Sequence, residues 1–207
     1  MFYEPHQRDR AALPHDPFKA IIAPRPIGWV TTMSKSGAVN LAPYSFFNAL
    51  SGEPPLIGFS SEGFKDSAAF AEETREFTFN LATWDLRENM NKTSAPLPRG
   101  ESEFVFAGLT PAPAKIVKPP RVKESPAALE CVVTEIIRLR DRNGAESDNH
   151  FVIGQVVGVH LDDRFIVNGR FDGAAAKAIA RCGYRDYAVV TEYFSMSRPE
   201  GAGDLAS

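Results

Sequence analysis

The residues best suited to bind a ligand lie in two short stretches of the first third of the chain. In the first, Thr31 and Thr32 end an apolar run, and a glycine turn leads into Asn40-Leu41-Ala42, with Ser45 and Phe46 beyond. An asparagine amide and free backbone groups both donate and accept hydrogen bonds, which suits the polar edge of a flat heterocycle. An ordinary β-hairpin in which Asn40 caps the turn explains the same residues, so both interpretations stay open.

The second stretch has the sequence SSEGFKDS and leaves a predicted strand, turns at a glycine and enters a predicted helix. The hydroxyls of Ser60, Ser61 and Ser67 and the ammonium of Lys65 are groups that bind phosphate. A helix N-terminus adds free backbone N–H groups. A plain helix start, with Asp66 as the N-cap and a solvated lysine, is the alternative.

Motifs for other chemistries are missing from the sequence. No GxGxxG follows a predicted strand, and neither a GxxxxGK[ST] loop nor a GxSxG turn occurs. His150 and His160 fall on one face of a predicted strand but roughly 33 Å apart, too far to share a metal ion. Cys131 and Cys182 form no CxxC pair, so we expect reduced thiols and no metal site.

Size and charge narrow the class of protein. The 207 residues suit one domain, and a net charge of -3 with scattered Lys and Arg argues against nucleic-acid binding. No stretch approaches the ~20 consecutive apolar residues that span a bilayer. The first 15 residues lack the apolar segment of a secretory signal, so we expect a cytoplasmic protein without membrane contact.

Strands dominate the predicted elements, and helices are few and short. Alternating and β-branched residues predict strands at 27–33, 38–42, 56–60, 76–82, 129–140 and 150–161. Helices are predicted at 65–74, 84–92 and 174–180. Residues 1–20 are expected to form an N-terminal arm, 94–126 a long loop that wraps the body, and 199–207 a frayed tail. Without regular βαβ alternation, the pattern favours a mainly β fold, a β-barrel with short α-helices.

These motifs together resemble those of the flavin reductase-like family, including its flavoredoxin branch. The resemblance covers roughly residues 20–198 and is most specific in the first half. Matching positions are Val30-Thr31-Thr32, Asn40 to Phe46, Pro54-Pro55, Lys65-Asp66-Ser67 and Glu76-Phe77 to Asn80. The chain departs at Ser67, where the family usually has threonine, and at Phe70, where many members have asparagine. The hydroxyl survives at the first of these positions.

The resemblance implies an FMN-binding split β-barrel of Greek-key type, with one domain over residues 1–207 that forms a homodimer. The flavin ring is then expected to contact Thr31, Thr32, Asn40, Leu41 and Ala42, with Ser45 and Phe46 nearby. The FMN phosphate is expected at Ser60, Ser61, Lys65 and Ser67, beside Asp66.

The implied activity is hydride transfer from NADH or NADPH to the flavin, with a monooxygenase component as one kind of acceptor. Because the cofactors carry that chemistry, no protein nucleophile is needed. His150 either orients the flavin or nicotinamide, as a catalytic residue, or is a solvent-exposed residue at a strand end. Two alternatives are an FMN electron carrier without its own NAD(P)H activity and an oxidase of a pyridoxine phosphate-like ring. The oxidase needs clustered arginines, which the sequence does not show.

Overall fold

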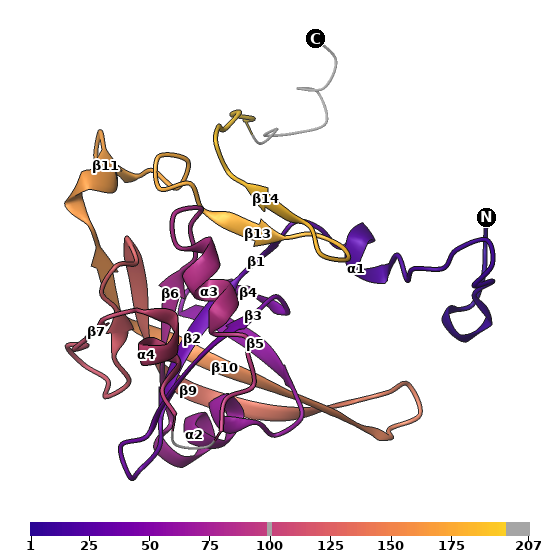
Figure 1. Cartoon of the computed structure of the whole chain (residues 1–207), viewed down its shortest axis with the longest axis horizontal. Coiled ribbons are helices and arrows are strands. Elements are labelled where there is room, and N and C mark those ends of the chain that lie inside the picture. Colours follow the sequence, from indigo (N-terminus) through magenta and orange to yellow (C-terminus); the bar gives the residue numbers. More distant parts are fainter. Residues whose placement is uncertain (99–100, 198–207) are drawn as a thin grey trace.

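A seven-stranded antiparallel sheet forms the body of the molecule (Figure 1). The computed structural model describes residues 1–98 and 101–197. The strands follow the order β3-β2-β6-β9-β10-β5-β4 across this sheet. Their bounds are β2 Gly28–Met33, β3 Val39–Tyr44, β4 Phe47–Gly52, β5 Pro55–Glu62, β6 Glu76–Leu81, β9 Ala127–Arg140 and β10 Glu146–Leu161.

Shorter strands and short helices complete the structure. A three-stranded sheet joins β1 (Arg25–Pro26), β13 (Ile179–Arg181) and β14 (Tyr187–Val189). Two strand pairs join β7 (Pro111–Ala112) to β8 (Arg121–Val122) and β11 (Ile166–Val167) to β12 (Arg170–Phe171). The α-helices are α1 Phe18–Ile21, α2 Asp66–Thr74, α3 Arg87–Lys92 and α4 Glu103–Ala107, and single 3-10 turns span Pro5–Gln7 and Asp163–Phe165. Within the described ranges, no helix is long and apolar enough to cross a membrane.

The large sheet curls into a barrel around an aromatic core. The ring of Tyr44, next to one sheet edge, lies 4.8 Å from that of Phe59, near the other edge. The Phe47 ring stacks on Phe79 at 5.0 Å. A larger residue at position 154 would force the Phe77 ring or the strand to move, because its Cβ atom would lie 2.3 Å from that ring. The close approach of strand and ring therefore needs a glycine.

A second apolar cluster covers the outer face of β2, β3 and β6. Trp29 and Leu41 are fully buried there, against Met90 of α3 and Phe104 of α4. The indole N–H of Trp29 donates to the Thr93 hydroxyl at 2.9 Å, which joins the sheet to the segment after α3. These contacts set the position of residues 93–97 relative to β3, a point on which the candidate site depends.

Polar side chains on the sheet hold the segment that wraps the body. Asn80 accepts from the Val122 N–H at 2.7 Å, and the Thr78 hydroxyl donates to the Pro119 carbonyl at 2.8 Å. The carboxylate of Glu130, which is fully buried, accepts from the N–H groups of residues 115, 116 and 117. Segment 94–126 is therefore not only loop: besides these attachments it contains α4, β7 and β8.

Three local expectations from the sequence differ from the structure. The helix predicted at 174–180 is wrong: a turn with a positive φ of 51° at Lys177 leads into β13. Asp66 is not the N-cap of α2, because Lys65 occupies that position and makes no side-chain cap. Strand β4 was not predicted, since FNALSG lacks β-branched residues. The expected frayed tail at 199–207 lies outside the described residues.

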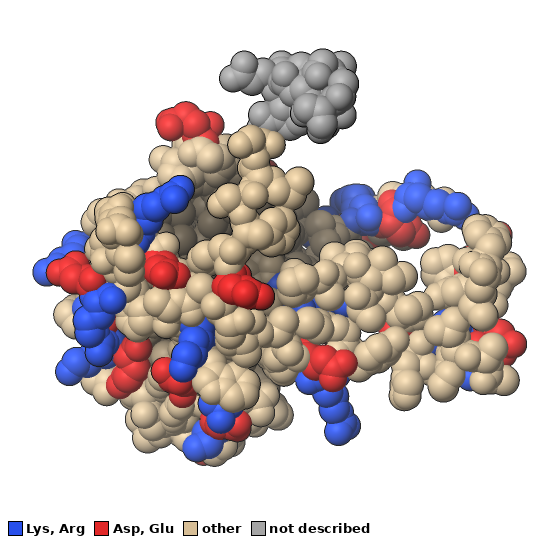
Figure 2. Space-filling model, turned by 90° about the horizontal axis from the view of Figure 1, so that it is seen from above, with Lys and Arg blue, Asp and Glu red and all other residues tan. Residues whose placement is uncertain are grey.

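The N-terminal arm stands away from the body in two views (Figures 1 and 2). Buried Arg25 fixes the point where the arm meets the body, since its guanidinium donates to the carbonyls of Lys19, Ile22 and Cys182. Charges of both signs are scattered over the face in Figure 2. That face therefore carries no broad basic surface of the kind that binds nucleic acid.

Candidate functional site

The free edge of β3 provides the backbone of the candidate site. Strand β3 is the last strand of the large sheet, so one row of its backbone groups faces away from β2. Pro43 has no N–H to lose and is tolerated at such an edge. The Leu41 N–H points outward from the sheet and donates to the Glu103 carboxylate of α4 at 3.2 Å. This donor is therefore within reach of a ligand that displaces Glu103.

The N-terminus of α2 opens beside this edge. The helix has nine residues, and its Lys65 N-cap makes no side-chain cap, so its first-turn N–H groups have no side-chain partner. Such N–H groups bind anions, helped by the helix dipole. The Lys65 side chain is exposed at the same place. Of the predicted phosphate-binding residues, Lys65 and Ser67 thus lie beside β3.

Residues after α3 and one residue of α4 complete the wall opposite β3. The resulting β3 cleft has a volume of about 420 Å³, within the range of small-molecule sites. Its lining residues are Asn40, Ala42, Pro43, Tyr44, Lys65, Asp66, Ser67, Thr93, Ser94, Ala95, Pro96, Leu97 and Glu103. Sequence reasoning missed residues 93–97 and Glu103, because only the attachment of their segment to the sheet brings them to β3.

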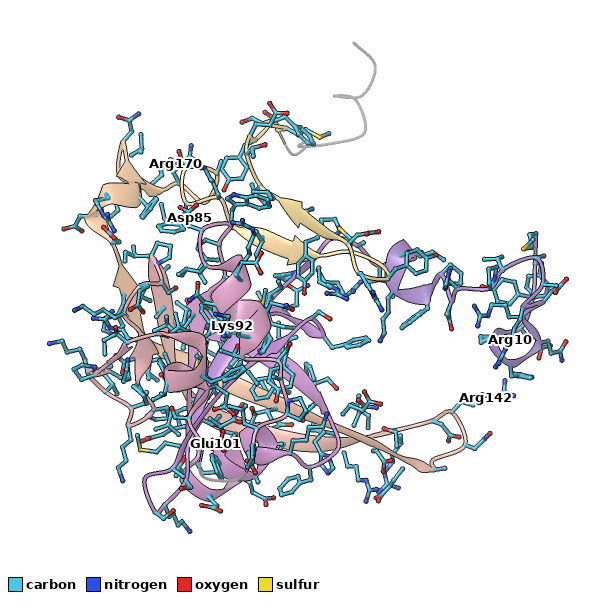
Figure 3. The ribbon with its side chains drawn as sticks, in the orientation of Figure 1. Arg10, Asp85, Lys92, Glu101, Arg142 and Arg170 are labelled. Atoms are coloured by element: carbon cyan, nitrogen blue, oxygen red, sulfur yellow. The ribbon has the colours of Figure 1, made fainter. Side chains whose placement is uncertain are left out.

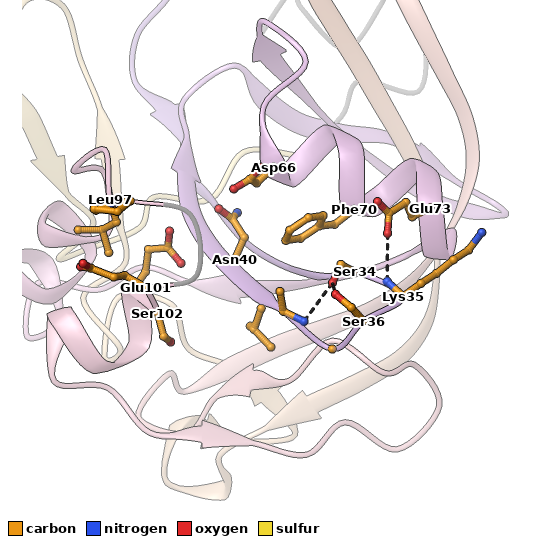
Figure 4. A pocket seen from close by; sticks show the side chains of 15 residues that line it. Ser34, Lys35, Ser36, Asn40, Asp66, Phe70, Glu73, Leu97, Glu101 and Ser102 are labelled. Atoms are coloured by element: carbon orange, nitrogen blue, oxygen red, sulfur yellow. Dashed lines mark hydrogen bonds between the residues drawn. The ribbon is translucent and has the colours of Figure 1, made fainter.

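A larger hollow of about 730 Å³ adjoins the β3 cleft (Figure 4). The two share Asn40, Asp66, Leu97 and Glu103. Asn40, Asp66 and Phe70 lie on one side of the hollow in Figure 4, and Leu97, Glu101 and Ser102 lie on the other. With Glu73 also in its lining, this hollow is acidic.

Buried hydrogen bonds fix polar side chains in and next to the cleft. The Asn40 amide donates to the Ser67 hydroxyl at 2.6 Å. Burial raises the pKa of Tyr44, although hydrogen bonds with Ser67 and Ser61 act in the opposite direction. Ser61 is fully buried and donates to the Gly63 carbonyl at 3.0 Å. Asn40 and Ser67 therefore hold each other in place, while Ser61 is bonded to Gly63 and does not line the cleft.

Glu103 is the acidic group closest to the free edge of β3. Its pKa is raised by burial above all and also by the charge of Asp66, while hydrogen bonds from its own backbone and that of Leu41 lower it. The Glu103 carboxylate thus accepts a hydrogen bond from the Leu41 N–H, but the partial burial of its negative charge costs free energy. A neutral carbonyl oxygen in its place would accept the same hydrogen bond without a buried charge.

The two threonines of β2 point to opposite faces of the sheet. The Thr31 hydroxyl accepts from the Asn80 amide at 3.1 Å, on the face covered by the wrapping segment. Thr32 lies opposite Asn40 in the β2–β3 register, and its buried hydroxyl has no hydrogen-bond partner among the described residues. Thr32 is fully buried and Thr31 is bonded to Asn80, and neither threonine lines the β3 cleft.

Three predicted residues lie in a different cavity. Ser45, Phe46 and Ser60 line an apolar space of about 560 Å³ with Ile21 of α1 and Phe151 of β10. Successive residues of a strand point to opposite faces, so Ser60 and its neighbour Ser61 are separated by the sheet. The structure thus does not gather all of the predicted residues in one cleft.

His150 is half-buried and lies near the phosphate-binding end of the predicted site. It pairs with Ser61 in the β10–β5 register, and its ring meets Phe64 edge to face at 5.0 Å. Its Nδ1 is buried without a hydrogen-bond partner in the described part of the chain. The β3 cleft is lined by other residues, so this geometry does not bring His150 to the expected ring position.

The donors and acceptors of the β3 cleft fit FMN. The Leu41 N–H and the Asn40 amide are suited to the carbonyl and N3–H edge of the flavin ring. Lys65 and the uncapped N-terminus of α2 are suited to the phosphate.

The fold and much of the sequence are shared with known proteins. The family model for the flavin reductase like domain matches residues 22–173. An uncharacterised protein of Halalkalibacterium halodurans is 40% identical over 183 residues, which cover 86% of this chain and 87% of the relative.

Two solved structures show the same architecture. Nitrilotriacetate monooxygenase component B from Bacillus cereus is 31% identical, with a TM-score of 0.85 over 95% of this chain and 98% of the other. A protein with a split barrel domain from Shewanella frigidimarina is 27% identical, with a TM-score of 0.76 over 89% of each chain. The fold expectation of a mainly β split barrel is confirmed. The match over residues 22–173 and the 40% identical relative show that the chain belongs to the flavin reductase-like domain family.

Proposed function

We propose that this protein binds FMN in the β3 cleft and reduces it with NADH or NADPH. The observation that carries the proposal is the β3 cleft, which brings Asn40 and Lys65 together with Glu103, the carboxylate that accepts from the Leu41 N–H. When bound, FMN would supply the acceptor for a hydride from the nicotinamide, chemistry that belongs to the cofactors and not to protein side chains. The protein binds and orients the two rings, which supplies proximity and excludes water.

Each group in the cleft has a defined part in this proposal. Leu41 donates its N–H to a flavin carbonyl, and Glu103 moves aside. Asn40, held by Ser67, binds the pyrimidine edge of the ring. Lys65 and the N-terminus of α2 neutralise the phosphate. Backbone N–H groups aimed at the ring would stabilise the negative charge that a bound flavin gains on reduction.

Anaerobic mixing of the purified protein with FMN and NADH or NADPH tests the activity. The proposal expects the visible absorbance of the flavin to bleach with either nucleotide. Bound flavin that stays oxidised with both nucleotides would leave the alternative, an FMN electron carrier reduced by a partner protein. Protein that retains no flavin and accelerates no reduction would contradict both.

We propose further that the protein is a homodimer and that its reduced flavin serves an acceptor such as a monooxygenase component. One structural relative is named as component B of a monooxygenase, which supports the second part. The apolar side chains of Ile21, Ile22, Phe46 and Leu50 are between 43% and 77% exposed and lie around one cavity. An exposed apolar surface beside a protruding arm suits a second copy of the chain.

A further inference from the structure

A groove rich in arginine lies between α3 and the β13–β14 pair, at a distance from the acidic hollow. Its volume is about 490 Å³. Trp84, Arg87, Glu88, Met90, Asn91, Ile179, Arg181, Arg185, Tyr187 and Val189 line it. The groove is here named the arginine groove. In Figure 3, the labels of Asp85 and Lys92 mark the two ends of the α3 region that forms one of its sides.

The arginine groove connects to the β3 cleft. A cavity of about 390 Å³ shares Met90, Asn91, Arg181 and Tyr187 with the groove. The same cavity shares Pro43 and Ser94 with the β3 cleft. An elongated ligand can therefore reach from one to the other along the surface between β3 and α3.

Charge is distributed unevenly along this path. Three arginines and a single acid, Glu88, line the arginine groove. The connecting cavity adds Lys19 and Arg25 and has no acid in its described lining. Asp66 and Glu103 line the β3 cleft, in contrast. A second phosphate group on the path is therefore bound more favourably at the arginine end.

Flat side chains accompany the arginines. The Arg87 guanidinium lies 4.0 Å from the centre of the Trp84 ring, and that of Arg181 lies 4.5 Å from the Tyr187 ring. Trp84 and Tyr187 are 43% and 42% exposed, so each pair offers a flat surface to a ligand. Purine bases stack on such aromatic and guanidinium planes, while the outer N–H groups of arginine bind phosphate in pairs.

From these observations we propose that the arginine groove binds a phosphorylated adenosine. The purine stacks on the Trp84–Arg87 or Tyr187–Arg181 pair, and the exposed Arg185 binds the phosphate with the other arginines. The identity of the ligand rests on the proposed function: it is the adenosine end of NADPH or the ADP part of NADH. In each case the rest of the dinucleotide extends toward the β3 cleft.

Isothermal titration of the full chain without flavin tests this proposal separately from the activity. The ligands are adenosine 2′,5′-bisphosphate for NADPH, ADP for NADH, and adenosine as the phosphate-free reference. We expect one phosphorylated ligand to bind at least about tenfold more tightly than adenosine, the effect of one added charge-assisted contact of ~1.4 kcal/mol. The ligand that binds more tightly identifies the source of the adenosine.

Variants connect the binding to the groove. Arg185→Ala is expected to remove most of the preference for the phosphorylated ligand, and Arg185→Lys to keep part of it. Arg164→Ala, at a guanidinium paired with Asp162, is the matched control and is expected to bind as the parent does. Equal binding of all three ligands, or equal binding by Arg185→Ala and Arg164→Ala, overturns the proposal. Failure of flavin reduction leaves these results unaffected, so the two proposals fail independently.

Discussion

Single residues of the β3 cleft divide into those that attract FMN and one that competes with it. Lys65 is exposed next to the uncapped start of α2, and its replacement leaves the helix itself unchanged. We expect Lys65→Ala to weaken FMN binding about tenfold, the value of one charge-assisted contact. Quenching of flavin fluorescence measures the dissociation constant, with Lys123→Ala as the exposed control. Unchanged affinity in Lys65→Ala would place the phosphate elsewhere.

Glu103 should act in the opposite direction. Its carboxylate occupies the Leu41 N–H and adds negative charge to a cleft expected to receive a phosphate. We expect Glu103→Ala to bind FMN several-fold more tightly, because the backbone donor is freed and a repulsion is removed. The same fluorescence titration measures this, with Glu101→Ala, two residues earlier in the chain, as the control. Weaker binding in Glu103→Ala would show that the carboxylate itself contacts the flavin.

The buried Glu130 links folding to pH. Burial alone would raise its pKa, but hydrogen bonds from His160 and three backbone N–H groups lower the pKa from 4.5 to about 2. A carboxyl group with a lowered folded-state pKa adds stability above its unfolded pKa, and this is lost as the pH falls toward the folded value. Between about pH 4.5 and 2, the loss amounts to about 3 kcal/mol.

Urea unfolding at a series of pH values measures this effect. Glu130→Gln is expected to be less stable at pH 7 and to lose less stability than the parent protein between pH 4.5 and 2. Glu135→Gln, at an exposed position of the same strand, should keep the parent profile. Parallel profiles for the parent and Glu130→Gln would refute the assignment.

At the scale of elements, β6 controls the wrapping segment and, through it, one wall of the site. Asn80 accepts from the Val122 N–H and donates to the Trp29 carbonyl and the Thr31 hydroxyl. We expect Asn80→Ala to lower the free energy of unfolding by about 2–3 kcal/mol, because buried backbone groups lose their partners. Cleavage of segment 94–126 by a protease should become faster, while Asn143→Ala in an exposed turn should change neither. Unchanged proteolysis would show that the segment is held by other contacts.

The sequence predicted elements with strong local signals and missed those set by distant contacts. Alternation of β6 and the long runs of β9 and β10 were visible, since each strand carries its own pattern. The 174–180 helix was wrongly predicted from alanine content, because a positive φ at Lys177 interrupts it. Strand β4 has weak propensity and forms through pairing with β5. Propensity yields to tertiary contacts in both cases.

The sequence likewise predicted some residues of the candidate site and missed those that distant contacts bring there. Asn40, Lys65 and Ser67 were predicted from motifs and do line one cleft. The separation of Ser60 from Ser61 follows from strand alternation, but which of the two faces the cleft depends on the fold. Glu103 and the three arginines of the arginine groove have no local motif, and the fold alone brings Arg87 close to Arg181 and Arg185.

At the scale of the whole molecule, the protruding arm and the exposed apolar surface concern assembly. Arg10 of the arm and Arg142 at the tip of the β9–β10 hairpin both lie far from the centre of the molecule (Figure 3). We expect light scattering to give twice the monomer mass for the parent protein and a monomer for Ile21→Glu, because a buried unpaired charge is costly. Ile166→Glu is the control outside this surface. A monomeric parent would contradict the dimer.

The central claim is that FMN binds along the free edge of β3. A crystal structure of the protein with FMN tests it most directly. The account predicts a flavin carbonyl at hydrogen-bond distance from the Leu41 N–H, Glu103 displaced from that donor, and the phosphate beside Lys65 and the N-terminus of α2. Flavin bound elsewhere, with the Leu41 N–H still bonded to Glu103, would contradict it.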